Sequence, residues 1–150
     1  MATNTDLRER RLVQRLLAYW RDLAPEGRLP AAHGIQPADL ADLWPACFIL
    51  DIGGPKPVFA YVGALHVAHH GRDLSGRPTE EAGVGTLLGR SVEYLDEVLS
   101  LKVPITYGGT FTGADGEPVA YRSILLPLSD DGEAIDGILG GANCRLDEFK

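Results

Sequence analysis

Apolar residues are most concentrated toward the end of the chain, in three runs separated by two short polar breaks. The runs cover residues 105–112, 119–128 and 135–144, and each break contains an Asp-Gly pair. Asp-Gly is a strong hairpin signal because glycine readily takes the positive φ values that tight turns require. The pattern therefore predicts an antiparallel meander of three strands. Such a sheet needs another layer of structure on each apolar face, and earlier segments must supply it.

A helical period of apolar positions marks residues 6–24, near the N-terminus. At the usual 100° per residue the apolar stripe is about 160° wide, which is broader than the seam of a coiled coil. The sequence Pro-Glu-Gly at 25–27 ends the helix. A stripe of this width predicts that the helix contacts two surfaces, its own domain and a partner. Its members are Leu12, Val13, Leu16, Leu17, Tyr19, Trp20, Leu23 and Ala24.

A first hairpin is expected in the middle of the chain. Residues 47–52 form a short apolar run typical of a buried strand, and residues 58–62 form a second strand. A turn of Gly53, Gly54 and Pro55 joins them. Because side chains alternate along a strand, we expect Phe59 and Tyr61 to lie on the same side of the sheet.

Helical segments flank this hairpin. Pro37 can open a short helix at its first position, and residues 64–70 are expected to form one or two helical turns. Residues 71–78 are an irregular loop with two glycines. Residues 86–102 are predicted to form the second long helix, which Val103-Pro104 ends. Its apolar face consists of Leu87, Leu88, Val92, Leu95, Val98 and Leu99.

Composition and charge narrow the class of protein. The chain has 150 residues, of which 45% are hydrophobic and 23% charged, as in an ordinary globular domain. We divide it into an N-terminal amphipathic helix, residues 1–27, and a main domain, residues 28–150. The net charge of −7 argues against nucleic acid or an anionic membrane as partner, since both attract clustered Lys and Arg. Acidic residues interleave the N-terminal arginines, which we interpret as a solvated helix face: Arg8, Arg10, Arg11 and Arg15.

The two cysteines and the N-terminus indicate the compartment. Cys47 and Cys144 lie in or beside apolar runs and have no zinc-binding spacing, so buried thiols in a reducing compartment are expected. No apolar run reaches the roughly 18 residues of a transmembrane helix, and the N-terminus is charged where a signal peptide would be apolar. These features predict a cytoplasmic protein.

The order of elements resembles the PAS domain, and this resemblance carries the fold prediction. It implies an α+β fold with a five-stranded antiparallel sheet, strand order 2-1-5-4-3, helices on one face and here an extra N-terminal helix. Within the superfamily, the chain resembles small stand-alone bacterial PAS proteins over residues 28–144. Such proteins are sensory or regulatory modules, so the resemblance implies a class of function rather than a chemistry. The segments that carry it are 48–52, 59–63, 71–76, 125–132 and 135–140.

No cofactor, metal or catalytic group is expected. Helical spacing lets His66, His69 and His70 share a face, but no nearby cysteine or HExxH motif completes a metal site. Haem-binding PAS domains hold iron through a histidine on the long helix, and residues 86–102 contain none. Flavin-binding light-sensing PAS domains need a cysteine in the region that corresponds to residues 71–83, and it is absent. No phosphate loop or GxSxG nucleophile elbow is present either.

A mostly apolar ligand cavity is predicted between the sheet and residues 86–102, bordered by the short helix that carries His66. Tyr121 and Arg122 point to opposite faces of their strand, and either could face this cavity. A core tyrosine without ligand contact is the alternative for Tyr121. Two other functions stay open: a small enzyme with His66, His69 or His70 as acid-base group, and a structural interaction module with a filled core. The candidate ligand-binding residues are Phe59, Tyr61, His66, His70, Leu95, Tyr107, Tyr121 and Arg122.

A homodimer is expected from the pattern of the second strand of the meander. Residues 124–126 are apolar on both alternating faces, whereas a sheet covered on one side should alternate apolar and polar residues. The N-terminal helix is the element available to cover the second face. PAS domains often dimerise through a helix that precedes the core, so the resemblance implies a two-fold interface. We place Leu16, Leu17 and Trp20 in it.

Overall fold

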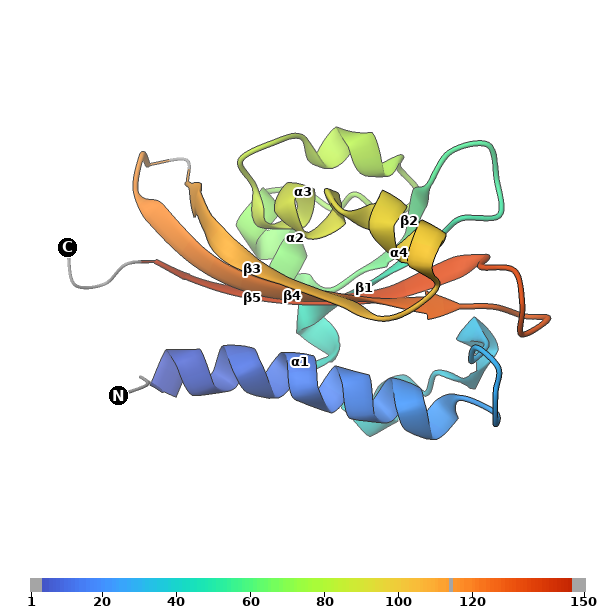
Figure 1. Cartoon of the computed structure of the whole chain (residues 1–150). Helices are drawn as coiled ribbons and strands as arrows, with labels where there is room; N and C mark the ends of the chain where they lie inside the picture. Colours follow the sequence, from blue (N-terminus) through green and yellow to red (C-terminus); the bar gives the residue numbers. More distant parts are fainter. Residues whose placement is uncertain (1–3, 114, 147–150) are drawn as a thin grey trace.

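The protein is a five-stranded antiparallel sheet with a layer of helices on each face (Figure 1). The structure, a computed structural model, describes residues 4–113 and 115–146, and side chains within 11–113 and 115–144. The strand order is β2-β1-β5-β4-β3, as predicted. The strands are β1 (Cys47–Asp51), β2 (Val58–Val62), β3 (Ile105–Thr112), β4 (Pro118–Leu128) and β5 (Gly137–Leu146).

The helices divide between the two faces. Three short helices cover one face, the helix side: α2 (Ala64–His70), α3 (Leu87–Val92) and α4 (Leu95–Leu101). The long helix α1 (Asn4–Leu23) crosses the opposite face, where it lies along β4 and β5 (Figure 1). Single turns of 3-10 helix complete the chain: η1 (Ala32–Gly34), η2 (Pro37–Leu40), η3 (Trp44–Ala46) and η4 (Thr79–Ala82). Within the described residues no helix is both long and apolar enough to cross a membrane.

Two apolar cores result, one on each side of the sheet. In β4, Leu125 faces the helix side and packs with Phe48 and Leu88. Ile124 and Leu126 face α1, where Leu12 and Leu16 cover them and become fully buried. The prediction that the N-terminal helix covers the second face of the sheet is therefore confirmed. Burial of this stripe contributes several kcal/mol at about 25 cal/mol per Å² of apolar area.

The predicted long helix at 86–102 is wrong as one element. It is broken between α3 and α4 at Tyr94, whose φ of −102° and ψ of 24° are not helical. The break turns the Tyr94 side chain into the sheet, where its hydroxyl lies 2.5 Å from the Ser123 hydroxyl. Thr86 caps α3, because its side chain accepts a hydrogen bond from the Gly89 amide.

The prediction that Phe59 and Tyr61 lie on the same side is also wrong. Leu50 pairs with Phe59 and Ile49 with Tyr61, so Ala60 is an extra residue in β2, a β-bulge. The bulge leaves Phe59 in the helix-side core and sends Tyr61 to the α1 side. There the Tyr61 ring stacks on Trp44 at 4.5 Å, and its hydroxyl donates to the Trp44 carbonyl.

Candidate functional site

The space between the sheet and α3–α4, where a ligand cavity was predicted, is occupied by side chains. Phe48, Phe59, Leu74 and Leu88 are at most 1% exposed there, and Leu95 is 7% exposed. Two pockets, of about 510 and 570 Å³, lie instead at the end of the sheet where β5 extends beyond β1. Strand β1 begins at Cys47, opposite Gly141, so the following residues of β5 have no β1 residue beside them. One pocket opens on each face of the sheet at this end.

The first of these, the helix-side pocket, has a volume of about 570 Å³ and a largely apolar lining. It lies between the end of α2, the start of α3 and strands β3 to β5. Glycines with positive φ on both sides, Gly83 and Gly85, hold Val84 at its rim, where Val84 is 87% exposed. The lining residues are His69, His70, Val84, Gly85, Thr86, Leu87, Phe111, Thr112, Gly113, Val119 and Cys144.

Besides Thr86 and Thr112, the polar residues that line this pocket are His69, His70 and Cys144. The Cys144 Sγ lies 3.9 Å from Nε2 of His69. His70 Nδ1 is buried, and no described residue hydrogen-bonds to it. Burial, and to a lesser degree the charge of Arg72, lowers the pKa of His70. The pocket therefore offers imidazole and thiol groups to a ligand in an otherwise apolar setting.

His66, by contrast, is a structural histidine. Its side chain is fully buried, and it is not among the residues that line the pocket. Nε2 donates to the Ala46 carbonyl at 2.7 Å, which ties α2 to η3, and the ring meets Phe48 edge to face. Burial lowers the pKa of His66 to about 4, so the imidazole is neutral near pH 7. No described group of three or more His, Cys, Asp or Glu side chains is arranged to hold a metal ion.

The remaining candidate ligand residues are distributed over different regions. Phe59 and Leu95 belong to the helix-side core. Tyr121 is buried beside Phe111, next to the helix-side pocket but outside its lining. Tyr107, 47% exposed, stacks on Tyr94 at the far end of β3.

Tyr61 and Arg122 lie on the α1 side of the sheet, so they cannot share a cavity with the other candidates. Tyr61 packs with the core under α1. Arg122 is exposed and alternates with Tyr121 and Ser123, which face the helices. Of the eight candidates, His70 is the one that lines the helix-side pocket. Val84, Phe111 and Val119 were missed, although the Gly-Val-Gly sequence at 83–85 is a signal for an outward-facing apolar residue.

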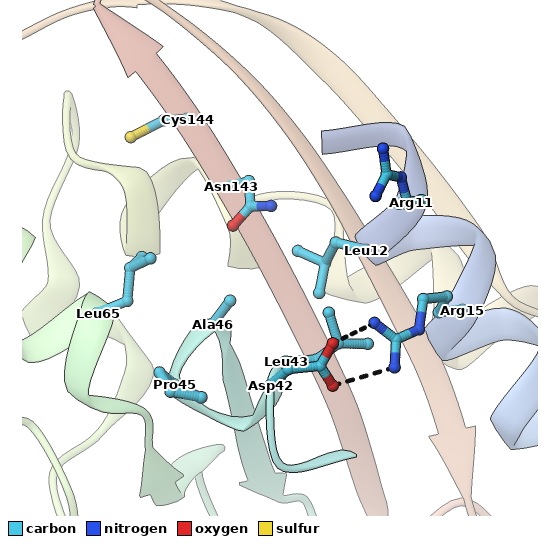
Figure 2. A pocket seen from close by; sticks show the side chains of 10 residues that line it. All are labelled: Arg11, Leu12, Arg15, Asp42, Leu43, Pro45, Ala46, Leu65, Asn143 and Cys144. Carbon is cyan, nitrogen blue, oxygen red and sulfur yellow. Dashed lines mark hydrogen bonds and ion pairs between the residues drawn. The ribbon is translucent and has the colours of Figure 1, made fainter. Parts of the chain in front are cut away.

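The second hollow, the α1 pocket, lies on the other face and has a volume of about 510 Å³. Figure 2 shows α1 on one wall, the turn before β1 on another, and β5 between them. Arg15 and Asp42 form an ion pair across it through two hydrogen bonds, one of them 3.0 Å long between Nη2 and Oδ1. The lining residues are Arg11, Leu12, Arg15, Asp42, Leu43, Pro45, Ala46, Leu65, Asn143 and Cys144.

The proposed dimer residues differ in exposure. Leu16 is fully buried against the sheet of its own chain, so it cannot touch a partner while α1 stays docked. Leu17 and Trp20 are partly exposed, and Trp20 Nε1 donates to the Pro127 carbonyl at 2.7 Å. Leu16 therefore belongs to the core, and the interface prediction now depends on Leu17 and Trp20.

Comparisons with known proteins agree with this architecture. Residues 8–142 match the family model described as PAS domain. Among solved structures, a light-oxygen-voltage domain studied with a flavin analogue has a TM-score of 0.56 and 16% identity, covering 75% of this chain and 85% of its own. The Aureochrome1 light-oxygen-voltage domain in its light state has a TM-score of 0.54 and 14% identity, covering 77% and 91%.

A third similar structure is the light-oxygen-voltage domain of a blue-light-activated histidine kinase from Erythrobacter litoralis. Its TM-score is 0.51 at 19% identity, with 67% of this chain and 95% of that chain covered. At these identities the similarity shows the fold alone. No curated protein matches the sequence.

Proposed function

Because this chain belongs to the PAS domain family, we propose that it is a cytoplasmic sensory or regulatory module without catalytic activity, whose input is a small, largely apolar molecule in the helix-side pocket. The observation that carries this proposal is Val84. An apolar side chain that is 87% exposed at the rim of an apolar pocket is stabilised when a ligand covers it. The volume of about 570 Å³ is within the range of small-molecule sites.

The polar groups of the pocket would orient the ligand. His69 and His70 come from α2 and Cys144 from β5, whereas the apolar Phe111 and Val119 come from β3 and β4. A ligand with one hydrogen-bonding end and one apolar end matches this division. His69 and Cys144 carry groups that can take part in hydrogen bonds with a ligand, whereas His70 Nδ1 is itself buried and has no hydrogen-bond partner among the described residues.

Binding in this pocket has a direct route to α1. Cys144 lines the pocket from β5, and three residues earlier in the same strand Gly141 packs against Leu16 of α1. A ligand that shifts the end of β5 would therefore change the surface on which α1 rests. We assign the output to α1 and to a homodimer that forms along its partly exposed side, with Leu17 and Trp20.

A flavin between the sheet and the helices, as the fold family suggests, does not fit this chain. That space is filled by Phe48, Phe59, Leu74 and Leu88, which are at most 1% exposed. The loop at 71–83 contains no cysteine for a photochemical adduct. We therefore expect a protein without visible absorption even when it is purified from cells supplied with flavin.

Native mass spectrometry of freshly purified protein, followed by binding of the neutral dye Nile red, tests the proposal. We expect a dimer and a dye complex that Val84→Asp weakens at least about tenfold, because a charge at the rim opposes an apolar ligand. Val103→Asp is the matched control, since Val103 is another exposed valine outside this pocket. Equal binding by both variants, or no binding by the unmodified protein, would contradict a ligand site at the helix-side pocket.

A further inference from the structure

The α1 pocket carries a positive charge in a protein that is acidic as a whole. Its charged lining side chains are Arg11, Arg15 and Asp42, which give a net charge of +1, against −7 for the chain. Arg15 and Asp42 neutralise each other, and this pairing lowers the pKa of Asp42, which stays ionised. Arg11 forms no ion pair with any side chain that the structure describes. Its guanidinium group is therefore the charge available to a ligand.

Apolar side chains form the floor of the same pocket. Leu12 and Ala46 are buried beneath it, and Leu43 and Leu65 are partly buried at its sides. They come from α1, from the turn before β1 and from α2. A ligand lying on this floor would touch three elements that are far apart in the sequence. The floor suits an alkyl or aryl group, because its apolar side chains can offer such a group dispersion contacts and burial from water.

Asn143 adds a neutral polar group to the lining of the same pocket. It projects from β5 between Leu12 and Cys144, on the face of the strand that α1 covers (Figure 2). The first residue of β1, Cys47, pairs with Gly141 of β5. Asn143 therefore has no β1 residue beside it in the sheet. Its amide can donate to an anionic oxygen that Arg11 also binds, and such charge-assisted hydrogen bonds are the stronger ones.

We propose that the α1 pocket binds a small free carboxylate with an apolar tail, its carboxylate held by Arg11 and Asn143 and its tail on Leu12, Ala46 and Leu65. The volume of about 510 Å³ fits a single-chain or single-ring acid. Arg11 and Asn143 select the anion, and the apolar floor selects a tail over a bare inorganic anion. This site is distinct from the helix-side pocket, because among the described residues the two linings have Cys144 alone in common.

Occupation of the α1 pocket would fasten α1 to the domain. Arg11 and Leu12 belong to α1, whereas Ala46, Leu65 and Asn143 belong to the domain that α1 covers. A ligand that binds only when α1 is docked stabilises the docked state in proportion to its concentration. A carboxylate would therefore act on the same helix to which we assign the homodimer surface.

Octanoate and the neutral 1-octanol are suitable probes, because they differ in the charged group and share the same chain length. Amide shifts in NMR spectra of the full chain at neutral pH would locate each probe and give its affinity. We expect octanoate to shift the amides of Leu12, Leu65 and Asn143. Arg11→Gln should weaken octanoate at least about tenfold while leaving octanol unchanged, since it removes only the charge.

Two further variants complete the test. Asn143→Leu should weaken octanoate and leave octanol bound, because the floor remains. Arg21→Gln removes an exposed arginine of the same helix outside the pocket and should change neither probe. The proposal is overturned if octanoate does not bind at millimolar concentration, or if Arg11→Gln and Arg21→Gln behave alike. It is also overturned if the shifts are confined to Val84 and Phe111, which would place the probe in the helix-side pocket.

Discussion

Leu16 of α1 packs directly on the bare backbone of Gly141 in β5. A Cβ atom on Gly141 would overlap the Cδ1 atom of Leu16, and the same helix brings Leu12 to within van der Waals reach. On the other face of the strand, the neighbouring Gly140 leaves room for the ring of Phe48 in the same way. The close approach of α1 to the sheet therefore depends on the absence of a side chain at one position.

Gly141→Ala should destabilise the protein by about 1–3 kcal/mol, because the added methyl group overpacks the contact with Leu16. Urea denaturation gives the change in the free energy of unfolding. Gly54→Ala is the control, since Gly54 lies in an exposed turn, has no positive φ and has open space where a methyl group would stand. Combining Gly141→Ala with Leu16→Ala should cost less than the sum of the two single changes, because the truncated side chain gives the methyl group room. Additive costs would show that the contact is not responsible.

The sheet and the helices on its two faces could be predicted, because turn residues and apolar periodicity are local patterns that recur along the sequence. Turn residues delimited the meander, and the run at 124–126 showed that both faces of β4 needed cover. The wide stripe on the N-terminal helix left one element suited to that task. The strand order itself came from the PAS resemblance, because alternation and turns do not tell which strands far apart in the chain are neighbours.

The bulge at Ala60 and the break at Tyr94 could not be read from periodicity. Ala60 is ordinary in a strand, and the bulge accompanies the stacking of Tyr61 on Trp44, a residue outside the hairpin. Tyr94 directly precedes Leu95 of the predicted apolar face, and its hydroxyl lies beside that of Ser123 on β4. Both departures arise from tertiary contacts that override local preference.

The position of the candidate site was harder to predict than the fold. Which cavity remains open depends on how completely large side chains fill the others. Phe59 and Leu95 were correctly expected between sheet and helices, but they fill that space instead of lining a cavity. The helix-side pocket depends instead on Val84 and Phe111, and nothing in the sequence connects these two positions.

Tyr94→Phe should cost about 1–3 kcal/mol of stability, because it leaves the buried Ser123 hydroxyl without its partner at 2.5 Å. Ser123→Ala in the same background should recover most of the loss, since both polar groups are then gone. The measurement is a double-mutant cycle by urea denaturation. Tyr107→Phe is the control, because the Tyr107 ring keeps its stack on Tyr94. A cycle without coupling energy would contradict a stabilising link between the hydroxyls.

Leu17→Glu should dissociate the proposed homodimer and leave the protomer folded, because Leu17 lies at the edge of the buried stripe of α1. A charge there opposes burial against a second copy. Light scattering measures the mass, and circular dichroism checks the fold. Point substitution is preferable to deletion of residues 1–27, since deletion would expose Ile124, Leu126 and Leu128, which are fully buried.

Ala41→Glu is the control for the added charge, because Ala41 is exposed and is not part of α1. It should leave the mass unchanged. If the unmodified protein is already a monomer at micromolar concentration, or if Leu17→Glu remains dimeric, the partly exposed side of α1 is not the interface.

His66 should make the protein less stable in acid. The Nε2 proton is donated to the Ala46 carbonyl, so protonation must occur at Nδ1, which is buried and has no hydrogen-bond partner among the described residues. Burial lowers the pKa of His66 to about 4 in the folded protein, against 6.5 as the reference value for an exposed histidine. At pH values between about 4 and 6.5, His66 binds a proton in the unfolded chain but not in the folded protein.

The contribution of His66 is therefore fully present above a pH of about 6.5 and is lost as the pH falls toward about 4, by roughly 3 kcal/mol in total. Urea denaturation at several pH values across this window measures the loss. His66→Gln should flatten this part of the profile, since the glutamine amide can still donate to the Ala46 carbonyl but does not titrate. His33→Gln removes an exposed histidine and should leave the profile unchanged. A profile that keeps its slope in His66→Gln would mean that the acid sensitivity arises from another group, with His70, whose pKa burial also lowers, as the next to be tested.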